Sequence, residues 1–385
     1  MARLGDIGAV ITGNTPKTSD NRNYDSNDIC FIKPSDINDN ELTDLYSSEY
    51  YISEYARSKA RILPAQSVLV TCIGIVGKIG INSLECAFNQ QINAIIPDDQ
   101  KCNYRYLAYA LQYKKPMLQN IANAPVVPIL NKSQFSDIEI PLPPLAEQCK
   151  IATVLDKVSG LIAKRRQQLD KLNELVKSRF IEMFGDPTTN PMGWDETTIG
   201  DECFYIKDGP HKSLPDIGKE NGGYPFISVR NIVNGYIDFS TARYISDADY
   251  ADAIKKCQPE KGDMLYSKGG TTGIAKLIDI DEKFANWVHV AVLKFDRSKL
   301  NGVFFENMLN SAYCYEQSQR LTKGIANRDL VLSAMAQIKM YRPPIELQNH
   351  FAAFIAQIDK SKLALQKSLD KLETLKRALM QKYFR

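Results

Sequence analysis

The chain has 385 residues, of which 44% are hydrophobic and 24% charged, and its formal net charge is +3. This composition is typical of a globular protein with about two or three domains and argues against disordered and fibrous classes. The first residues lack a basic segment followed by an apolar core, and no stretch approaches the ~20 apolar residues of a membrane span, so we expect a cytoplasmic protein.

Cysteines and histidines give no sign of a metal centre. The eight cysteines never form a Cys-x-x-Cys pair, and the three histidines lie far apart at His211, His289 and His350. Structural zinc needs four convergent ligands, so this spacing favours reduced thiols over a zinc site or a disulfide framework. We expect no metal to be bound.

The charges are distributed unevenly along the chain. Residues 1–140 and 188–340 each have two more acidic than basic side chains, whereas 141–187 and 341–385 have a basic excess of two and five. A protein that grips DNA alone by neutralising phosphates normally has a clearly basic domain or face. The distribution argues against that mode of binding.

The first globular segment, residues 1–142, mixes short β-branched and aromatic runs with glycine, asparagine and proline turns. Asp28–Ile32 is one such run, a helix is expected near Tyr104–Gln112, and Gly74–Gly77 is a turn after a short apolar strand. These patterns predict an α+β domain with a curved, mostly antiparallel sheet.

Residues 143–186 form one predicted long helix. Apolar residues recur every three or four positions from Ile151 to Met183, which places them on one helix face. Pro143 and Pro144 suit the first turn of a helix, and Gly185 suits its end.

The remaining chain repeats this order. Residues 187–342 resemble the first globular segment, since Phe226-Ile227 answers Phe31-Ile32, and a second long helix is predicted over 343–385. There, Phe351, Ile358, Leu365, Leu372 and Leu379 are spaced seven apart, as in a coiled coil.

The two helical segments match without a gap at a constant offset of 200. Pro143-Pro144 aligns with Pro343-Pro344, Gln148 aligns with Gln348, and the run Leu169–Leu172 is identical to Leu369–Leu372. An internal repeat of this kind predicts two equivalent helices related by a pseudo-twofold.

Each predicted helix spans roughly 38 residues or ~55 Å, too long for one small domain, so each is expected to pair with the other in antiparallel fashion. The sequence therefore predicts an α+β fold with two similar α+β domains separated by two long antiparallel helices, a coiled coil, and a pseudo-twofold repeat. The residues expected to pair the helices are Ile151, Val158, Leu172, Ile358, Leu365 and Leu372.

Catalytic signatures are missing from the sequence. It has no Asn/Asp-Pro-Pro-aromatic motif of the kind adenine methylation requires, and no Gly-x-x-x-x-Gly-Lys-Ser/Thr phosphate loop. The acidic run of Asp279, Asp281 and Glu282 could suggest a nuclease site, but metal-dependent cleavage needs carboxylates from separate elements. We interpret the run as a solvated turn and expect no catalytic residues.

Several motifs accompany the duplicated order: Pro-Pro-x-x-x-Gln at the start of each helix, Phe184–Pro187 followed by Trp194, and the loop Thr12–Pro16. With these motifs in this order, the chain resembles, over essentially its whole length, the specificity subunits of type I restriction-modification systems. The second domain departs at the early loop, where Asp208–Lys212 replaces Gly-Asn-Thr-Pro.

The resemblance implies target-recognition domains at 1–142 and 187–342, each reading half of a bipartite DNA target from the major groove. It implies that the helices, 143–186 and 343–385, set the spacer and dock two modification (methyltransferase) subunits, with two restriction subunits as further possible partners. No cofactor is expected on this chain; S-adenosylmethionine, ATP and magnesium would be bound by the partners.

Candidate contacts to double-stranded DNA are loop residues whose side chains can form hydrogen bonds with base edges. They are Thr15, Lys17, Lys33, Ser35, Lys78, Lys212, Arg230, Asn231, Lys268 and Thr271. For any one of them, an ordinary solvated surface residue is the competing interpretation.

Two other functions compete with the specificity subunit. The acidic balance of the globular segments would also suit a scaffold that binds protein through both domains, and the Asp279–Lys283 run is the basis for an undetected nuclease or methyltransferase. If the helices act as a ruler, half-site centres should lie somewhat more than one DNA turn, ~34–36 Å, apart.

Overall fold

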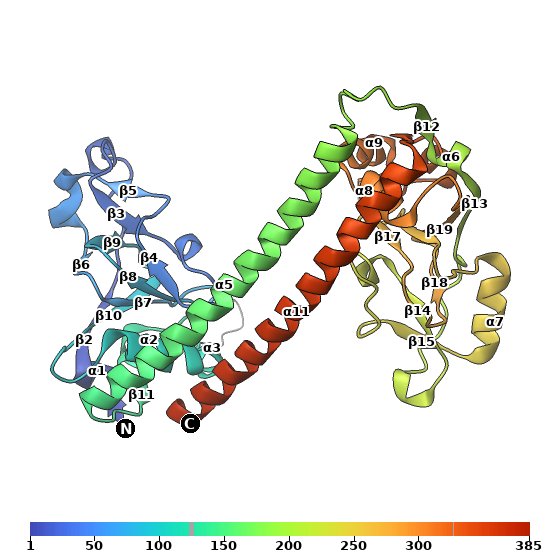
Figure 1. Cartoon of the computed structure of the whole chain (residues 1–385). Coiled ribbons are helices and arrows are strands. Elements are labelled where there is room, and N and C mark those ends of the chain that lie inside the picture. Colours follow the sequence, from blue (N-terminus) through green and yellow to red (C-terminus); the bar gives the residue numbers. More distant parts are fainter. Residues whose placement is uncertain (123–126, 326) are drawn as a thin grey trace. The chain divides into compact units, whose positions relative to one another are not determined.

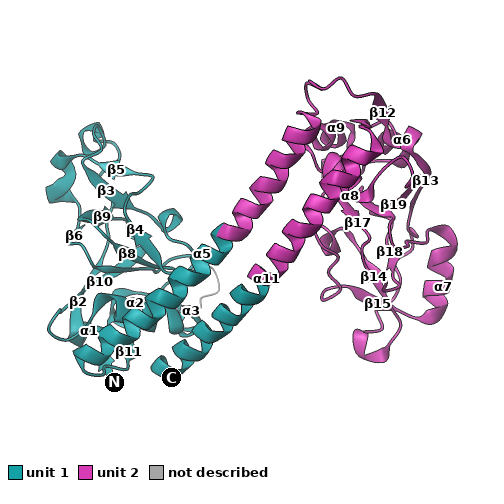
Figure 2. Cartoon of the chain, in the orientation of Figure 1, with its two compact units in different colours: residues 1–167, 366–385 teal, residues 168–365 magenta. Residues whose placement is uncertain are grey.

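The computed structural model describes residues 1–122, 127–325 and 327–385. The chain divides into two compact units, which Figure 2 colours separately. Unit 1 comprises residues 1–167 and 366–385, and unit 2 comprises residues 168–365. Each unit thus contains one globular domain and a part of both long helices.

Unit 1 contains two mixed sheets. Its strands are β1 (Ala2–Arg3), β2 (Gly8–Thr12), β3 (Ile29–Ile32), β4 (Thr43–Leu45), β5 (Tyr51–Ile52), β6 (Ile62–Leu63), β7 (Val68–Thr71), β8 (Ile79–Asn82), β9 (Cys86–Phe88), β10 (Ile92–Pro97) and β11 (Glu139–Ile140). One sheet has the order β2-β10-β7-β8-β4 and the other β5-β3-β9-β6, while β1 pairs with β11. The pairs β3–β9 and β4–β8 are parallel, and the other paired strands are antiparallel.

Strand β7 separates two apolar cores of unit 1. Val68 and Val70 join the cluster formed with the helices, and Leu69 joins the cluster shared with the second sheet. Successive side chains of a strand point to opposite faces, so a strand that is buried on both faces is apolar throughout. The helices of this domain are α1 (Leu4–Ile7), α2 (Tyr104–Tyr113), α3 (Lys115–Ile121) and α4 (Lys132–Ser136).

Unit 2 repeats the plan. Its strands are β12 (Glu196–Thr198), β13 (Cys203–Asp208), β14 (Tyr224–Ile227), β15 (Arg243–Ile245), β16 (Met264–Ser267), β17 (Ala275–Leu277), β18 (Ala285–Asn286), β19 (Val290–Phe295) and β20 (Lys339–Tyr341). The sheets have the orders β13-β19-β16-β17 and β15-β14-β18, and β12 pairs with β20. In β16, Met264 and Tyr266 face the helical core and Leu265 faces the second sheet, as in β7.

The shorter helices of unit 2 are α6 (Ile199–Glu202), α7 (Asp247–Lys256), α8 (Gly302–Leu309), α9 (Ala312–Leu321) and α10 (Leu332–Met335). Helix α8 is the counterpart of α2. Both helices begin after an asparagine, Asn103 or Asn301, whose side chain accepts hydrogen bonds from the first-turn backbone.

The long helices are α5 (Leu145–Phe184) and α11 (Ile345–Phe384), each of 40 residues and related by the offset of 200 (Figure 1). In unit 1, Arg166 of α5 pairs with Glu373, whereas Ile151, earlier in α5, clusters with Phe384 at the end of α11. In unit 2, Phe184 contacts Phe351, near the start of α11. The helices therefore run antiparallel in each unit.

The same glutamine joins each domain to the start of its long helix. The buried Gln148 side chain accepts from Asn103 N at 2.9 Å and donates to Lys101 O and Pro143 O at 3.0 and 2.9 Å. Gln348, also buried, bonds in the same way to Asn301 N, Lys299 O and Pro343 O at 2.8, 3.2 and 2.7 Å. The repeated Pro-Pro-x-x-x-Gln motif is thus a hydrogen-bonded junction.

Each long helix ends with a phenylalanine in an aromatic cluster. Phe184 lies 4.7 Å from Phe304 and 5.5 Å from Phe351 in unit 2, and Phe384 lies 5.2 Å from Tyr106 in unit 1, between ring centroids. Since Phe304 in α8 corresponds to Tyr106 in α2, the two ends are equivalent. The predicted α+β fold with two similar domains, two long antiparallel helices and an internal repeat is confirmed.

Candidate nucleic-acid interface

A glycine fixes the early loop of each domain. A Cβ on Gly13, after β2, would lie 2.1 Å from Asn89 O, and a Cβ on Gly209, after β13, would lie 1.7 Å from Asn286 O. Only glycine permits such an approach of two backbones. The second domain therefore keeps the attachment of this loop, although its other residues depart from Gly-Asn-Thr-Pro.

Thr15 and Lys17 follow that glycine in unit 1. Thr15 Oγ1 donates to Gln90 Oε1 at 2.7 Å, and Lys17 O accepts from Asn23 Nδ2 at 2.9 Å. Both residues are exposed, as is Lys212 on the corresponding loop of unit 2. The loop backbone is held while its side chains face solvent.

Lys33, Ser35 and Lys78 lie together around a short 3₁₀ helix, Pro34–Asp36. The Asp36 carboxylate accepts from Lys33 N at 2.7 Å, and Lys78 Nζ donates to Pro34 O at 3.0 Å. The Lys33 ammonium lies 3.1 Å from the centroid of the Tyr50 ring, a cation–π contact. The exposed Ser35 thus lies on a turn whose backbone is held by Asp36 and Lys78.

Asn231 and Arg230 occupy the matching 3₁₀ helix of unit 2, Val229–Asn231. Asn231 is 1% exposed, accepts from Ser228 N at 2.8 Å and donates to Asp238 O at 2.8 Å. It thus occupies the position of Asp36 and holds the turn. Arg230 is exposed at the position of Ser35 and donates to Thr241 O at 2.8 Å.

Lys268 and Thr271 lie on the loop between β16 and β17. Thr271 is exposed, but Lys268 is 5% exposed, and its ammonium lies 2.9 Å from Asp329 and 3.5 Å from Asp208. Asp208 also pairs with Lys256 at 2.7 Å. The hydrogen-bonding groups of Lys268 and Asn231 are therefore engaged inside the domain; DNA contact by any of the ten candidates stays a prediction.

Sequence reasoning did not identify two polar side chains next to Lys268. Trp287 Nε1 and His289 Nδ1 are buried and have no hydrogen-bond partner among the described residues. Lys268 N donates to His289 O at 2.8 Å, and a Cβ on Gly269 would meet His289 Nδ1 at 2.0 Å. In the sequence, the one signal for His289 is that histidine is rare in this chain. Only the fold shows that Trp287 and His289 lie next to Lys268.

The residues predicted to pair the helices differ in burial. Ile151, Val158 and Ile358 are 5%, 7% and 8% exposed, and Ile151 packs in one cluster with Met380 and Phe384. The other three, Leu172, Leu365 and Leu372, are half-buried. Pairing of the two helices by these six residues stays a prediction.

The acidic run is an exposed connection between β17 and β18. Asp279, Asp281, Glu282 and Lys283 are all exposed, and Asp281 pairs with Lys261 at 2.8 Å. Within the described ranges, no group of three or more His, Cys, Asp or Glu side chains converges to hold a metal. Nor does any helix in these ranges combine the length and apolarity needed to cross a membrane.

Comparison with known proteins gives a consistent result. The family model "Type I restriction modification DNA specificity domain" matches residues 1–174 and 191–377. The MjaIX type I specificity subunit of Methanocaldococcus jannaschii is 26% identical over 99% of this chain and 91% of its own length. The HindI specificity subunit of Haemophilus influenzae is 31% identical over 47% of this chain and 40% of its own length.

A solved structure supports the fold. The type I restriction-modification S subunit from M. genitalium aligns with a TM-score of 0.61 and 13% identity, covering 100% of this chain and 95% of that one. Since the family model spans both domains and most of both long helices, this chain belongs to the family of type I restriction-modification DNA specificity subunits.

Proposed function

We propose that this chain reads a split DNA target, one half through each globular domain, and that the long helices fix the gap between the halves. The observation that carries the proposal is the duplication. Each domain has sheets of similar strand order, an early loop that requires glycine and a glutamine junction to its long helix, yet the two domains present different exposed side chains. Side chains on loops can read base edges in the major groove while the scaffold holds their register.

The helices also offer a surface for partners. On the part of α5 that belongs to unit 1, Val154 and Leu161 are 38% and 47% exposed. Their spacing of 7 places them on one helix face, and exposed apolar side chains aligned in this way suit another helix. We infer that modification subunits dock here, two of them because the helices are repeated, and that restriction subunits are added to that complex.

The chemistry is assigned to those partners. Methyl transfer would use S-adenosylmethionine bound by the modification subunits, and DNA translocation and cleavage would use ATP and magnesium on the restriction subunits. This chain would contribute base contacts, and the partners would contribute much of the phosphate neutralisation that its two acidic domains lack.

The proposal is tested by co-expressing this chain with a cognate modification subunit in a host that lacks adenine methylation, and mapping methylated adenines across the genome. We expect a motif with two defined halves around an unspecified gap. An active modification subunit that methylates without sequence preference would contradict the proposal and favour the protein-binding scaffold.

The role of the helices has its own test. Removing from each helix one stretch of seven residues that includes the repeated Leu-Asp-Lys-Leu run shortens each helix by about 10 Å, or roughly three base pairs. The mapped gap should shorten while both half-sites keep their sequences. An unchanged gap would show that the helices do not set it.

A further inference from the structure

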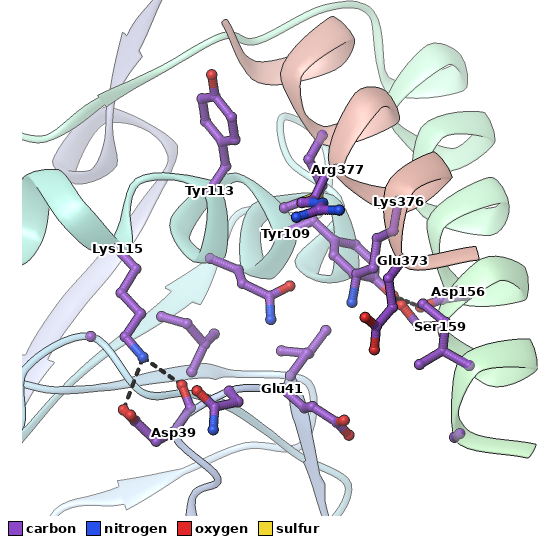
Figure 3. A pocket seen from close by; sticks show the side chains of 18 of the residues that line it. Asp39, Glu41, Tyr109, Tyr113, Lys115, Asp156, Ser159, Glu373, Lys376 and Arg377 are labelled. Carbon is purple, nitrogen blue, oxygen red and sulfur yellow. Dashed lines mark hydrogen bonds and ion pairs between the residues drawn. The ribbon is translucent and has the colours of Figure 1, made fainter. Parts of the chain in front are cut away.

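Unit 1 contains a large charged cleft that the proposed function does not use. Its volume is about 1080 Å³, and its walls come from the loop 39–42 and the strand β4 that follows it, from α2 and α3, and from α5 and α11 of this unit (Figure 3). Apolar side chains such as Ile162 and Met380 line it together with charged ones. Such a cleft can accept a segment of another molecule.

The carboxylates along the cleft are already paired. Each one has a cation within 4.0 Å, so a further positive charge would find no unpaired acid. The pairs are Arg105 with Asp44 and Asp156 at 2.8 and 3.2 Å, Lys115 with Asp39 at 2.9 Å, and Arg166 with Glu41 and with Glu373, the latter at 2.7 Å.

Two cations of α11, Lys376 and Arg377, are left over. Across the described parts of the chain neither has an acidic group within ion-pair distance; the Lys376 ammonium lies 5.8 Å from the centroid of the Tyr109 ring, and Arg377 donates to Thr374 at 3.2 Å. Burial and the Arg166 guanidinium lower the pKa of Lys376, although Asp156 and Glu373 act in the opposite direction. Lys376 is half-buried, whereas Arg377 is exposed. A half-buried charge without a partner, such as that of Lys376, destabilises the free chain.

Unit 2 shows that the fold does not require Lys376, although it keeps a cation, Lys177, in place of Arg377. At the offset of 200, Val176 stands in place of Lys376 and Ala356 in place of Asp156. Val176 packs against the apolar core of unit 2. The helix junction can therefore be closed with an apolar residue at this position, and the half-buried, unpaired Lys376 of unit 1 must be accounted for in another way.

We propose that the unit 1 cleft binds a segment of the modification subunit and that Lys376 and Arg377 receive a carboxylate from that segment. This deepens, and rests on, the proposed function. DNA is the less suitable occupant, because a strand brings one phosphate about every 3.4 Å and would meet five carboxylates in the cleft. A protein segment with one acidic side chain among apolar ones matches both the two cations and the apolar wall.

The direct test is carbodiimide cross-linking of the assembled complex, which joins an amine to a carboxylate in contact with it. We expect mass spectrometry to find Lys376 joined to an Asp or Glu of the modification subunit. Lys376→Arg keeps the charge but removes the reactive amine, so it should abolish this cross-link while the complex still assembles. An intact wild-type complex without any Lys376 cross-link to the partner would overturn the proposal.

Affinity gives an independent test. Lys376→Glu with Arg377→Glu should weaken binding of the modification subunit about thirtyfold or more, since a buried charge pair becomes a repulsion. The matched control is Lys371→Glu, an exposed lysine of α11 outside the cleft. Equal affinities of the double variant and the control contradict the proposal. Unchanged subunit affinity with weaker, less salt-dependent DNA binding would identify DNA as the occupant and also contradict it.

Stability separates a binding role from a structural one. Lys376→Met keeps the aliphatic stem and removes the unpaired charge, so it should raise the melting temperature of the free chain by roughly 2–4 °C while still weakening subunit binding. A lower melting temperature would mean that Lys376 serves the fold. Failure of this proposal leaves the split methylation motif of the wild-type complex intact, whereas failure of the proposed function removes that motif.

Discussion

The two units agree at the helix junctions and differ in the cleft beside them. Gln148 and Gln348 make the same three hydrogen bonds with the same kinds of partner. A few residues away, the ion pair of Asp156 with Arg105 has no counterpart at Ala356. After a duplication, groups that join domain to helix are retained because losing them leaves buried polar atoms unsatisfied, whereas residues lining an open cleft are free to diverge.

The same contrast applies to the candidate reading loops. Asp36 and Asn231 hold equivalent turns, but the exposed residues beside them are Ser35 in one unit and Arg230 in the other. A hydroxyl and a guanidinium recognise different base edges. Specificity is therefore best sought where an equivalent scaffold carries different exposed side chains.

The largest expected effect concerns the two helix ends. Phe184→Ala and Phe384→Ala should each lower the free energy of unfolding of their own unit by about 3–5 kcal/mol. Phe184 should cost more, because it contacts three aromatic rings and Phe384 contacts two.

Urea unfolding, followed separately for each unit, measures both losses, and Ile181→Ala, on the exposed face of α5, is the control. If Phe384→Ala proved the more costly, the ring contacts would not be the source of the difference.

The two glutamines should give matched effects. Gln148→Leu and Gln348→Leu keep the side-chain volume but leave buried backbone groups unsatisfied, so each should cost about 2–3 kcal/mol in the unit that contains it. Gln357→Leu, at an exposed position of α11, should cost little. If the two losses in free energy of unfolding differed by more than about 1 kcal/mol, the two junctions would not be equivalent, since local context accounts for smaller differences.

Two neighbouring residues of one turn, Asn231 and Arg230, should separate an effect on stability from an effect on base recognition. Asn231→Ala should lower the free energy of unfolding of unit 2 by about 1–3 kcal/mol, because the backbone groups at Ser228 and Asp238 lose their partner. Arg230→Ala should leave stability nearly unchanged and relax one position of the methylated motif. Thermal unfolding and methylation mapping together decide this, and an unaltered motif for Arg230→Ala would remove it from the reading site.

The periodic parts of the fold could be predicted from the sequence, because the apolar spacing and the repeated proline and glutamine positions are local signals. Both long helices, the helix after Asn103 and the turn at Gly74 follow from such signals. The burial of Asn231 and Lys268 could not be predicted, since asparagine and lysine are usually exposed and their partners Asp238, Asp329 and Asp208 are identified only by the fold. The cleft of unit 1 could not be predicted either, because its lining residues come from distant segments and only the fold shows that Lys376 lacks an acidic partner.

The smallest expected effect concerns the acidic run, which is also present in only one unit. Between β8 and β9 of unit 1 the chain has only Ser83, Leu84 and Glu85, whereas unit 2 inserts the exposed Asp279 and Asp281. Asp279→Asn with Asp281→Asn should change the free energy of unfolding by less than about 0.5 kcal/mol and leave methylation by the assembled complex unchanged, since surface ion pairs contribute little. Lost activity in this variant would revive the nuclease or methyltransferase hypothesis. Unchanged activity would identify this insertion as a solvated connection between two strands that takes no part in methylation.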